Sequence, residues 1–125
     1  MHFRRRSWPR KFADAFRGLS RAVRSQSSFF VHLWVATAVV AVAAVLRVSL
    51  VEWCLLIGAI GIVLVAEIFN TSIESLARAL DTGRHPRVRD ALDMASAAVL
   101  LSAVVAAVIG IAVFGHRAGV LGGFW

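Results

Sequence analysis

Three long runs of apolar residues, separated by short polar breaks, account for most of this 125-residue chain. They cover about residues 29–47, 50–80 and 87–114. An α-helix rises about 1.5 Å per residue, so about 20 apolar residues cross a hydrocarbon core of about 30 Å. We therefore predict an all-α membrane protein with three transmembrane helices in these ranges.

An amphipathic pattern precedes the first run. One helical face carries apolar residues spaced i, i+4, i+7 and i+11, namely Phe12, Phe16, Leu19 and Val23. Arginines lie off that face, and a basic amphipathic helix beside a span lies on the membrane surface. We predict a surface helix over residues 10–25, a disordered basic segment at 1–9 and a short outer tail at 116–125. Residues 10–115 then form a single membrane domain.

The basic residues are unevenly distributed. Of the 14 Lys and Arg, eight lie before residue 25, four lie between 78 and 89, and one lies at each of the other two helix ends. The positive-inside rule then makes the N-terminus and the 81–87 loop cytoplasmic and places the C-terminus outside. We expect a multi-pass protein of the cytoplasmic (inner) membrane, whose N-terminal helix binds anionic lipid headgroups rather than nucleic acid.

Three polar residues interrupt the cytoplasmic end of the second run. Glu67, Asn70 and Glu74 are spaced i, i+3 and i+7, so they share one helical face. Polar groups in a membrane segment are costly and indicate a functional site by default. Desolvation by apolar neighbours suits Glu67 to a general base, the more exposed Glu74 can hold Mg²⁺, and Asn70 can bind a substrate hydroxyl or a phosphate.

Asp93 opens the third run at the same membrane level. The small residues that follow it, at 95–98, allow close helix packing, which would bring Asp93 near the Glu67–Glu74 face. Structural pairing of Glu67 and Asn70, and simple solvation of Glu74 and Asp93, are alternative explanations. An ion pathway would need further polar groups deep in the first and third runs, which contain only Thr37 and Ser102. No Walker or GxGxxG nucleotide motif is present.

Two motifs resemble those of the prokaryotic diacylglycerol kinase family. The first is Glu67-Ile-Phe-Asn70-Thr-Ser-Ile-Glu74, and the second is Asp93-Met-Ala-Ser-Ala-Ala-Val, with His85-Pro86 in the loop between them. The resemblance covers about residues 10–115. It implies a homotrimer with active sites shared between subunits, which transfers the γ-phosphate of ATP to a membrane lipid hydroxyl, converting diacylglycerol to phosphatidic acid.

The resemblance also implies roles for particular residues. Glu67 would be the catalytic base and Glu74 would hold Mg²⁺ with ATP, while Asn70 and Asp93 would bind nucleotide or substrate. Ser96 and Arg89 are two further binding candidates, although helix packing and a positive-inside loop, respectively, explain them as well.

Three positions depart from the family pattern. The family usually has a Lys at the position of Leu92, a second metal-binding Glu at Gln26 and an acidic residue at Arg78. Arg78 or Arg89 can supply the missing positive charge. An undecaprenol kinase, and a catalytically degenerate homologue that acts as a membrane scaffold or lipid-binding protein, therefore remain alternatives.

Overall fold

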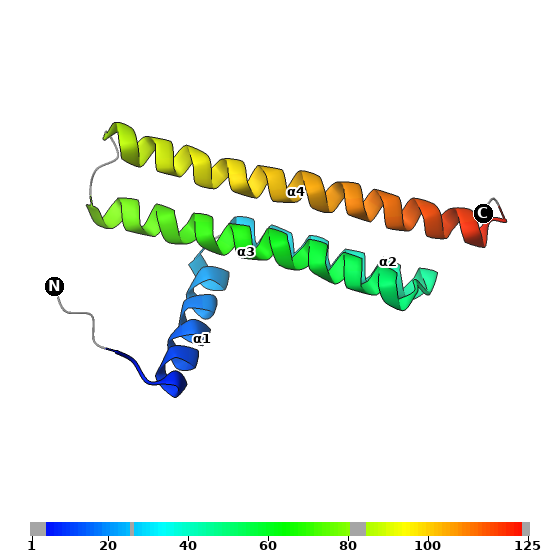
Figure 1. Cartoon of the computed structure of the whole chain (residues 1–125), viewed down its shortest axis with the longest axis horizontal. Coiled ribbons are helices and arrows are strands. Elements are labelled where there is room, and N and C mark those ends of the chain that lie inside the picture. The colour runs from blue at the N-terminus through cyan, green and yellow to red at the C-terminus, as the bar shows by residue number, and fades with distance from the viewer. Residues whose placement is uncertain (1–4, 26, 81–84, 124–125) are drawn as a thin grey trace.

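The computed structural model describes residues 5–25, 27–80 and 85–123, which form helices and no strands. The helices are α1 (Trp8–Ser25), α2 (Ser27–Leu46), α3 (Leu50–Leu80) and α4 (Pro86–Leu121). α3 and α4 lie side by side and antiparallel, α2 packs behind α3, and α1 crosses the direction of the long helices (Figure 1). α2, α3 and α4 are long and apolar enough to cross a membrane, which confirms the all-α membrane prediction.

A tight turn fixes the register of α2 against α3. The Val48 and Arg47 N–H groups donate to the carbonyls of Ala43 and Ala44, both at 3.3 Å, and Arg47 has a φ of 53°. These two bonds and the left-handed residue form a Schellman cap. Ser49 and Glu52 then form a reciprocal capping box, with Ser49 N–H to Glu52 Oε1 at 2.9 Å and Glu52 N–H to Ser49 Oγ at 3.2 Å.

The C-terminal end of α4 differs from the sequence prediction. The third span was expected to end at Phe114 with a tail at 116–125, but the helix continues to Leu121. Isolated glycines such as Gly115 cost a helix only about 1 kcal/mol each. Arg117 Nε donates to the carbonyl of Leu46 at 2.8 Å, which ties this extension to the end of α2.

The start of α1 also differs, because Trp8 and Pro9 were expected in the disordered segment but are helical. Proline is tolerated in the first turn, where its missing N–H has no helical partner. The Trp8 ring contacts Phe12 with centroids 6.4 Å apart, and Lys11 Nζ lies 4.5 Å from its centroid. Residues 5–7 of the expected segment precede the helix without regular secondary structure, and residues 1–4 lie outside the described residues.

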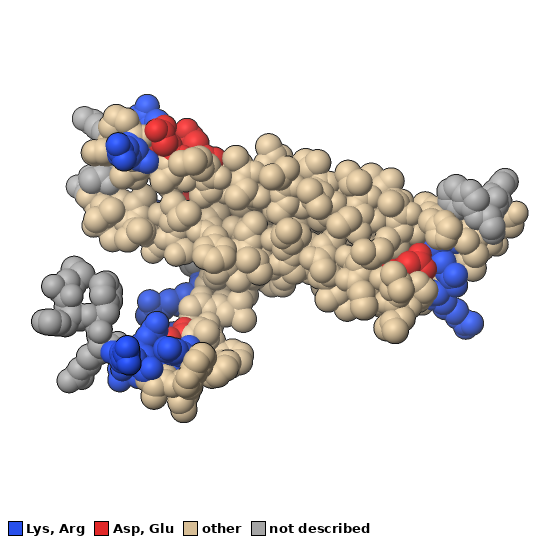
Figure 2. Space-filling model, viewed as in Figure 1, with Lys and Arg blue, Asp and Glu red and all other residues tan. Residues whose placement is uncertain are grey.

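The N-terminal end of α4 begins at a defined cap. His85 has an extended backbone, its Nδ1 accepts a hydrogen bond from the Arg87 N–H at 3.2 Å, and Pro86 occupies the first turn. Charged side chains lie at the two ends of the long helices and on α1, and none covers the middle of the visible face (Figure 2). That distribution is the one expected of helices whose middle portions contact lipid.

Candidate active site between α2 and α3

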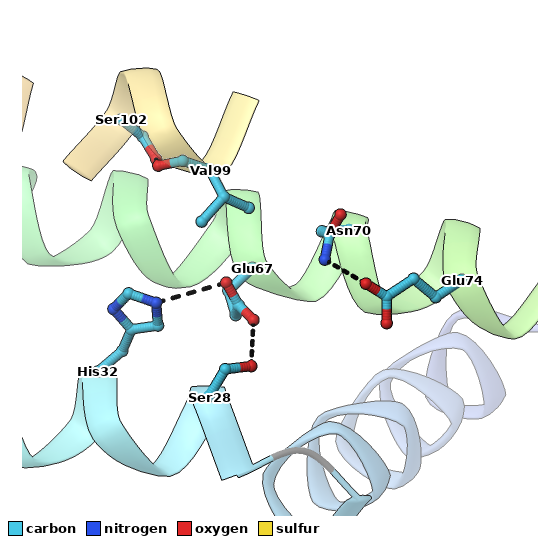
Figure 3. A network of polar contacts seen from close by, with 7 residues as sticks. All are labelled: Ser28, His32, Glu67, Asn70, Glu74, Val99 and Ser102. Carbon is cyan, nitrogen blue, oxygen red and sulfur yellow. Dashed lines mark hydrogen bonds and ion pairs between the residues drawn. The ribbon is translucent and has the colours of Figure 1, made fainter. Parts of the chain in front are cut away.

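Glu67 is buried between α2 and α3, with only 4 % of its surface exposed. Ser28 Oγ donates to Glu67 Oε1 at 2.6 Å, and His32 Nε2 lies 3.4 Å from Oε2 (Figure 3). Ser28 and His32 are four residues apart on α2, so both point to the same face of that helix. A buried carboxylate is stable when its oxygens have such partners, and these two hold it in one orientation.

Asn70 and Glu74 form a second polar contact, further along α3 toward its C-terminal end. Asn70 Nδ2 donates to Glu74 Oε1 at 2.9 Å (Figure 3). Asn70 Oδ1 is enclosed and has no hydrogen-bond partner in the described part of the chain. No existing hydrogen bond would therefore be lost if a small side-chain movement made this oxygen accessible to a substrate group.

Glu74 can fill its expected role as a Mg²⁺ ligand only if other ligands, such as substrate phosphates, complete the coordination. The described residues contain no group of three or more His, Cys, Asp or Glu side chains that could hold a metal ion. Mg²⁺ is commonly bound by one or two carboxylates together with substrate phosphates, so it does not need such a group. The half-buried Glu74 has one oxygen bonded to Asn70, and its second oxygen suits this type of coordination.

The candidates on α4 lie away from this cluster within one chain. Asp93, Ser96 and Arg89 are exposed, and α4 instead buries Ala95 and Ser102. Two residues correspond to about 200° of helical rotation, so Asp93 lies nearly opposite Ala95. No polar contact joins it to the Glu67–Glu74 face within the described residues. The expected approach of Asp93 to that face is therefore not made inside a single chain.

Two of the three residues that depart from the family pattern lie in the described part of the structure. Arg78 is exposed near the end of α3, and Leu92 is half-buried on α4. Gln26 lies outside the described residues. The loop between α3 and α4 is described only from His85 onward.

Sequence reasoning missed the two partners of Glu67. Neither Ser28, near the start of a helix, nor His32, within a run of apolar residues, stands out in the sequence as a partner of a buried carboxylate. Their positions did contain a signal, because Ser28 precedes Arg47 in the turn by 19 residues and Glu67 follows it by 20. Two antiparallel helices joined by a tight turn therefore bring these residues to the same level.

The two polar groups deeper in the membrane segments are satisfied locally. Thr37 Oγ1 donates to the carbonyl of Leu33, and Ser102 Oγ donates to that of Val99, each at 2.9 Å. Both bonds lie within one helix, so neither hydroxyl needs a partner from another helix or an ion.

An apolar groove begins at His32, the residue whose ring contacts Glu67. It has a volume of about 690 Å³ and is lined by α2, α3 and α4. His32 lies at one end, and the α4 wall extends from Ala103 to Gly115, a rise of about 18 Å. A hydrocarbon chain in this groove would have its polar end near Glu67.

The sequence was also compared with known proteins. Residues 13–114 match the model of the prokaryotic diacylglycerol kinase family. The chain belongs to this family. Undecaprenol kinase from Bacillus subtilis is 30 % identical over 105 residues, covering 84 % of this chain and 85 % of the relative. Diacylglycerol kinase from Synechocystis sp. is 32 % identical over 101 residues, covering 79 % of this chain and 57 % of the relative.

No solved structure matches the chain significantly. Both relatives are named as kinases, and the names specify two different lipids. Membership of the family makes this chain an ATP-dependent membrane lipid kinase.

Proposed function

We propose that the kinase transfers the γ-phosphate of ATP to a lipid hydroxyl placed at Glu67. The observation that carries this proposal is the burial of Glu67 in α3, where Ser28 and His32 orient its carboxylate. An oriented carboxylate next to an apolar groove can accept a proton from a hydroxyl at the end of a hydrocarbon chain.

In the proposed reaction, Glu67 accepts the hydroxyl proton as the lipid oxygen attacks the γ-phosphorus. A new O–P bond forms while the bond from the γ-phosphorus to the β,γ-bridging oxygen breaks, releasing ADP and the phosphorylated lipid. Asn70 Oδ1 accepts a hydrogen bond from a substrate donor, and Glu74 is the residue that would hold Mg²⁺. That ion, when bound, neutralises phosphate charge, and positioning supplies most of the remaining rate enhancement.

For the acceptor, we favour undecaprenol, with diacylglycerol as the second candidate. The undecaprenol kinase relative aligns over 85 % of its length, whereas the diacylglycerol kinase relative aligns over 57 %. Either lipid presents a hydroxyl at the end of an apolar body, so the groove beside His32 is compatible with both.

We also propose an arrangement in the membrane. Phe12 and Phe16 are 61 % and 70 % exposed on α1, which suits a helix lying in the interface with these rings in lipid. The distribution of Lys and Arg favours a cytoplasmic N-terminus in the inner membrane. A homotrimer would bring a neighbour's Asp93, Ser96 and Arg89 toward the Glu67–Glu74 face.

The experiment is a phosphoryl-transfer assay with the purified protein in vesicles. γ-labelled ATP is supplied with undecaprenol or with diacylglycerol, and label is followed into the lipid. We expect transfer to undecaprenol at a higher kcat/KM than to diacylglycerol. Faster transfer to diacylglycerol would reverse the substrate assignment. If neither lipid became labelled, the proposed function would be overturned.

A further inference from the structure

A second pocket lies between α1 and the inner half of α3. It has a volume of about 480 Å³ and is lined by three arginines and three hydroxyl side chains, namely Arg21, Arg24, Arg78, Thr71, Ser72 and Ser75. Ser75 follows Glu74 by one position, a rotation of about 100° around α3. The pocket is therefore next to the Asn70–Glu74 contact around the helix, and neither Asn70 nor Glu74 lines it.

The three arginines of this pocket are not neutralised by the chain around them. None of them forms an ion pair or hydrogen bond with a residue that the structure describes. Two other arginines near α1 are paired, because Arg6 and Arg17 lie 2.7 and 3.5 Å from the Asp14 carboxylate. Three like charges around one pocket repel each other, and a bound anion would remove that repulsion.

The lining indicates which anion fits. Guanidinium groups and hydroxyls are the usual donors to phosphate oxygens, and Arg binds phosphate with a planar, bidentate geometry. The rest of the wall is apolar and includes Ala22, which is buried, and Ile68. A phosphate joined to hydrocarbon satisfies both parts of this lining, whereas the ribose and base of a nucleotide would meet apolar side chains.

We propose that this pocket binds the phosphate headgroup of an anionic membrane phospholipid. The arginines contact the phosphate, and the apolar wall contacts the first part of the acyl chains. Because Arg21 and Arg24 belong to α1 and Arg78 belongs to α3, the bound lipid links the surface helix to the span that carries Glu67. This pocket and the apolar groove that begins at His32 have no lining residue in common, and lipid binding here does not depend on phosphoryl transfer.

Native mass spectrometry of the whole protein tests this site without ATP. The protein is released from a non-ionic detergent after incubation with dioleoyl phosphatidylglycerol or dioleoyl phosphatidylcholine. We expect bound phosphatidylglycerol on the wild type and about tenfold less on R21Q/R24Q, since two charge-assisted contacts are lost. R5Q/R10Q removes the same charge from the N-terminal region outside this pocket and should retain binding within about twofold.

R78Q provides an independent variant on another helix. We expect it also to reduce phosphatidylglycerol binding several-fold, while Gln preserves helix propensity at this exposed position. Equal losses of bound phosphatidylglycerol in R21Q/R24Q and R5Q/R10Q would mean that the lipid is attracted by the overall positive charge and not held in this pocket. That result would overturn the proposal. It would also fail if phosphatidylcholine bound equally well, or if ADP or inorganic phosphate displaced phosphatidylglycerol. The binding measurement uses no ATP, so its result does not depend on whether the protein transfers phosphate. The proposed lipid site and the proposed kinase mechanism can therefore fail independently.

Discussion

The carboxylate of Glu67 is held by side chains from a neighbouring helix. Leaving a buried charge without partners costs several kcal/mol, and a hydrogen bond to a charged group contributes about 1.5–3 kcal/mol. Ser28 and His32 supply such contacts from one side of α2. These two contacts hold the Glu67 side chain in one rotamer.

Removing the Ser28 hydroxyl should reduce turnover without unfolding the protein. Ser28→Ala deletes the 2.6 Å bond to Glu67 Oε1, and alanine is a better helix former than serine. We expect kcat for lipid phosphorylation to fall about 10- to 100-fold. Ser20→Ala, at an exposed position on α1, is the matched control and should stay within about twofold of wild type. Unchanged kcat in Ser28→Ala would show that this bond does not position the base.

The residues of the site differ in how far the sequence could predict them. Glu67, Asn70 and Glu74 were recognisable because spacing within one helix alone decides which residues share a face. The contacts of Glu67 with α2 depend on the register of two helices, which is set by the turn at Arg47. The surface position of Asp93 within one chain depends on which face α4 turns toward α3, and its small residues do not specify that face uniquely.

Among the helices, α3 illustrates good agreement with the sequence, since its bounds, Leu50–Leu80, are those expected. Ser49 caps its start, and Gly83 and Pro86 follow its end in the sequence. The extension of α4 to Leu121 was not predictable from such local signals. Its Arg117 contacts the carbonyl of Leu46, which is 71 positions away.

The apolar groove leads to a prediction for a glycine in α4. A Cβ atom added at Gly110 meets no atom within 4 Å, and Gly110 lines the groove, so the side chain of Gly110→Leu should occupy groove space. Leucine also favours a helix by about 0.8–1 kcal/mol over glycine. We expect KM for a long-chain lipid acceptor to rise about tenfold, with a smaller change for a short-chain analogue.

Gly58→Leu is the control for this substitution. Gly58 lies on α3 outside the groove, and a Cβ atom added there also meets no atom within 4 Å. Its KM should change little. If both variants raise KM equally for long and short acceptors, the groove does not hold the lipid chain.

The stability of the first half of α1 should decrease in acid, because protonation of Asp14 removes its interactions with arginines. The hydrogen bond from Arg6, with the nearby charges of Arg17 and Arg10, holds the pKa of the Asp14 carboxyl below its ordinary value. Because the folded-state pKa is the lower one, the contribution to helix stability is complete above the unfolded value of about 3.9. It is lost as pH falls through the folded value.

Hydrogen exchange of the α1 amides, corrected for intrinsic rates, measures this effect. We expect protection in α1 to fall below about pH 4 in the wild type and to be pH-independent there in Asp14→Asn. The same acid response in Asp14→Asn would assign the effect to another group.

At the scale of the whole molecule, a single chain leaves much apolar surface and three candidate site residues uncovered. Large side chains such as Ile111 and Val45 are 74 % and 80 % exposed, which a membrane or a neighbouring subunit would cover. Asp93 lies away from the Glu67–Glu74 face of its own chain. A site completed by a neighbouring subunit accounts for these observations.

Mixing two inactive variants tests such a shared site. Subunits carrying Glu67→Gln are co-assembled with subunits carrying Asp93→Asn in equal amounts. If each site takes Glu67 from one subunit and Asp93 from its neighbour, about a quarter of the sites in random closed oligomers contain both native residues. We expect lipid phosphorylation to recover to about that fraction of wild type. No recovery above the two pure variants would place both residues in the same subunit's site.

The most direct test of the central claim compares two glutamates of α3. Glu67→Gln removes the proposed base, whereas Glu52→Gln keeps the shape of a side chain in the capping box at the other end of the helix. With γ-labelled ATP and lipid in vesicles, we expect kcat to fall by about 10²–10⁴ in Glu67→Gln and by less than about threefold in Glu52→Gln. Equal label transfer by Glu67→Gln and the wild type would contradict the assignment of Glu67 as the base.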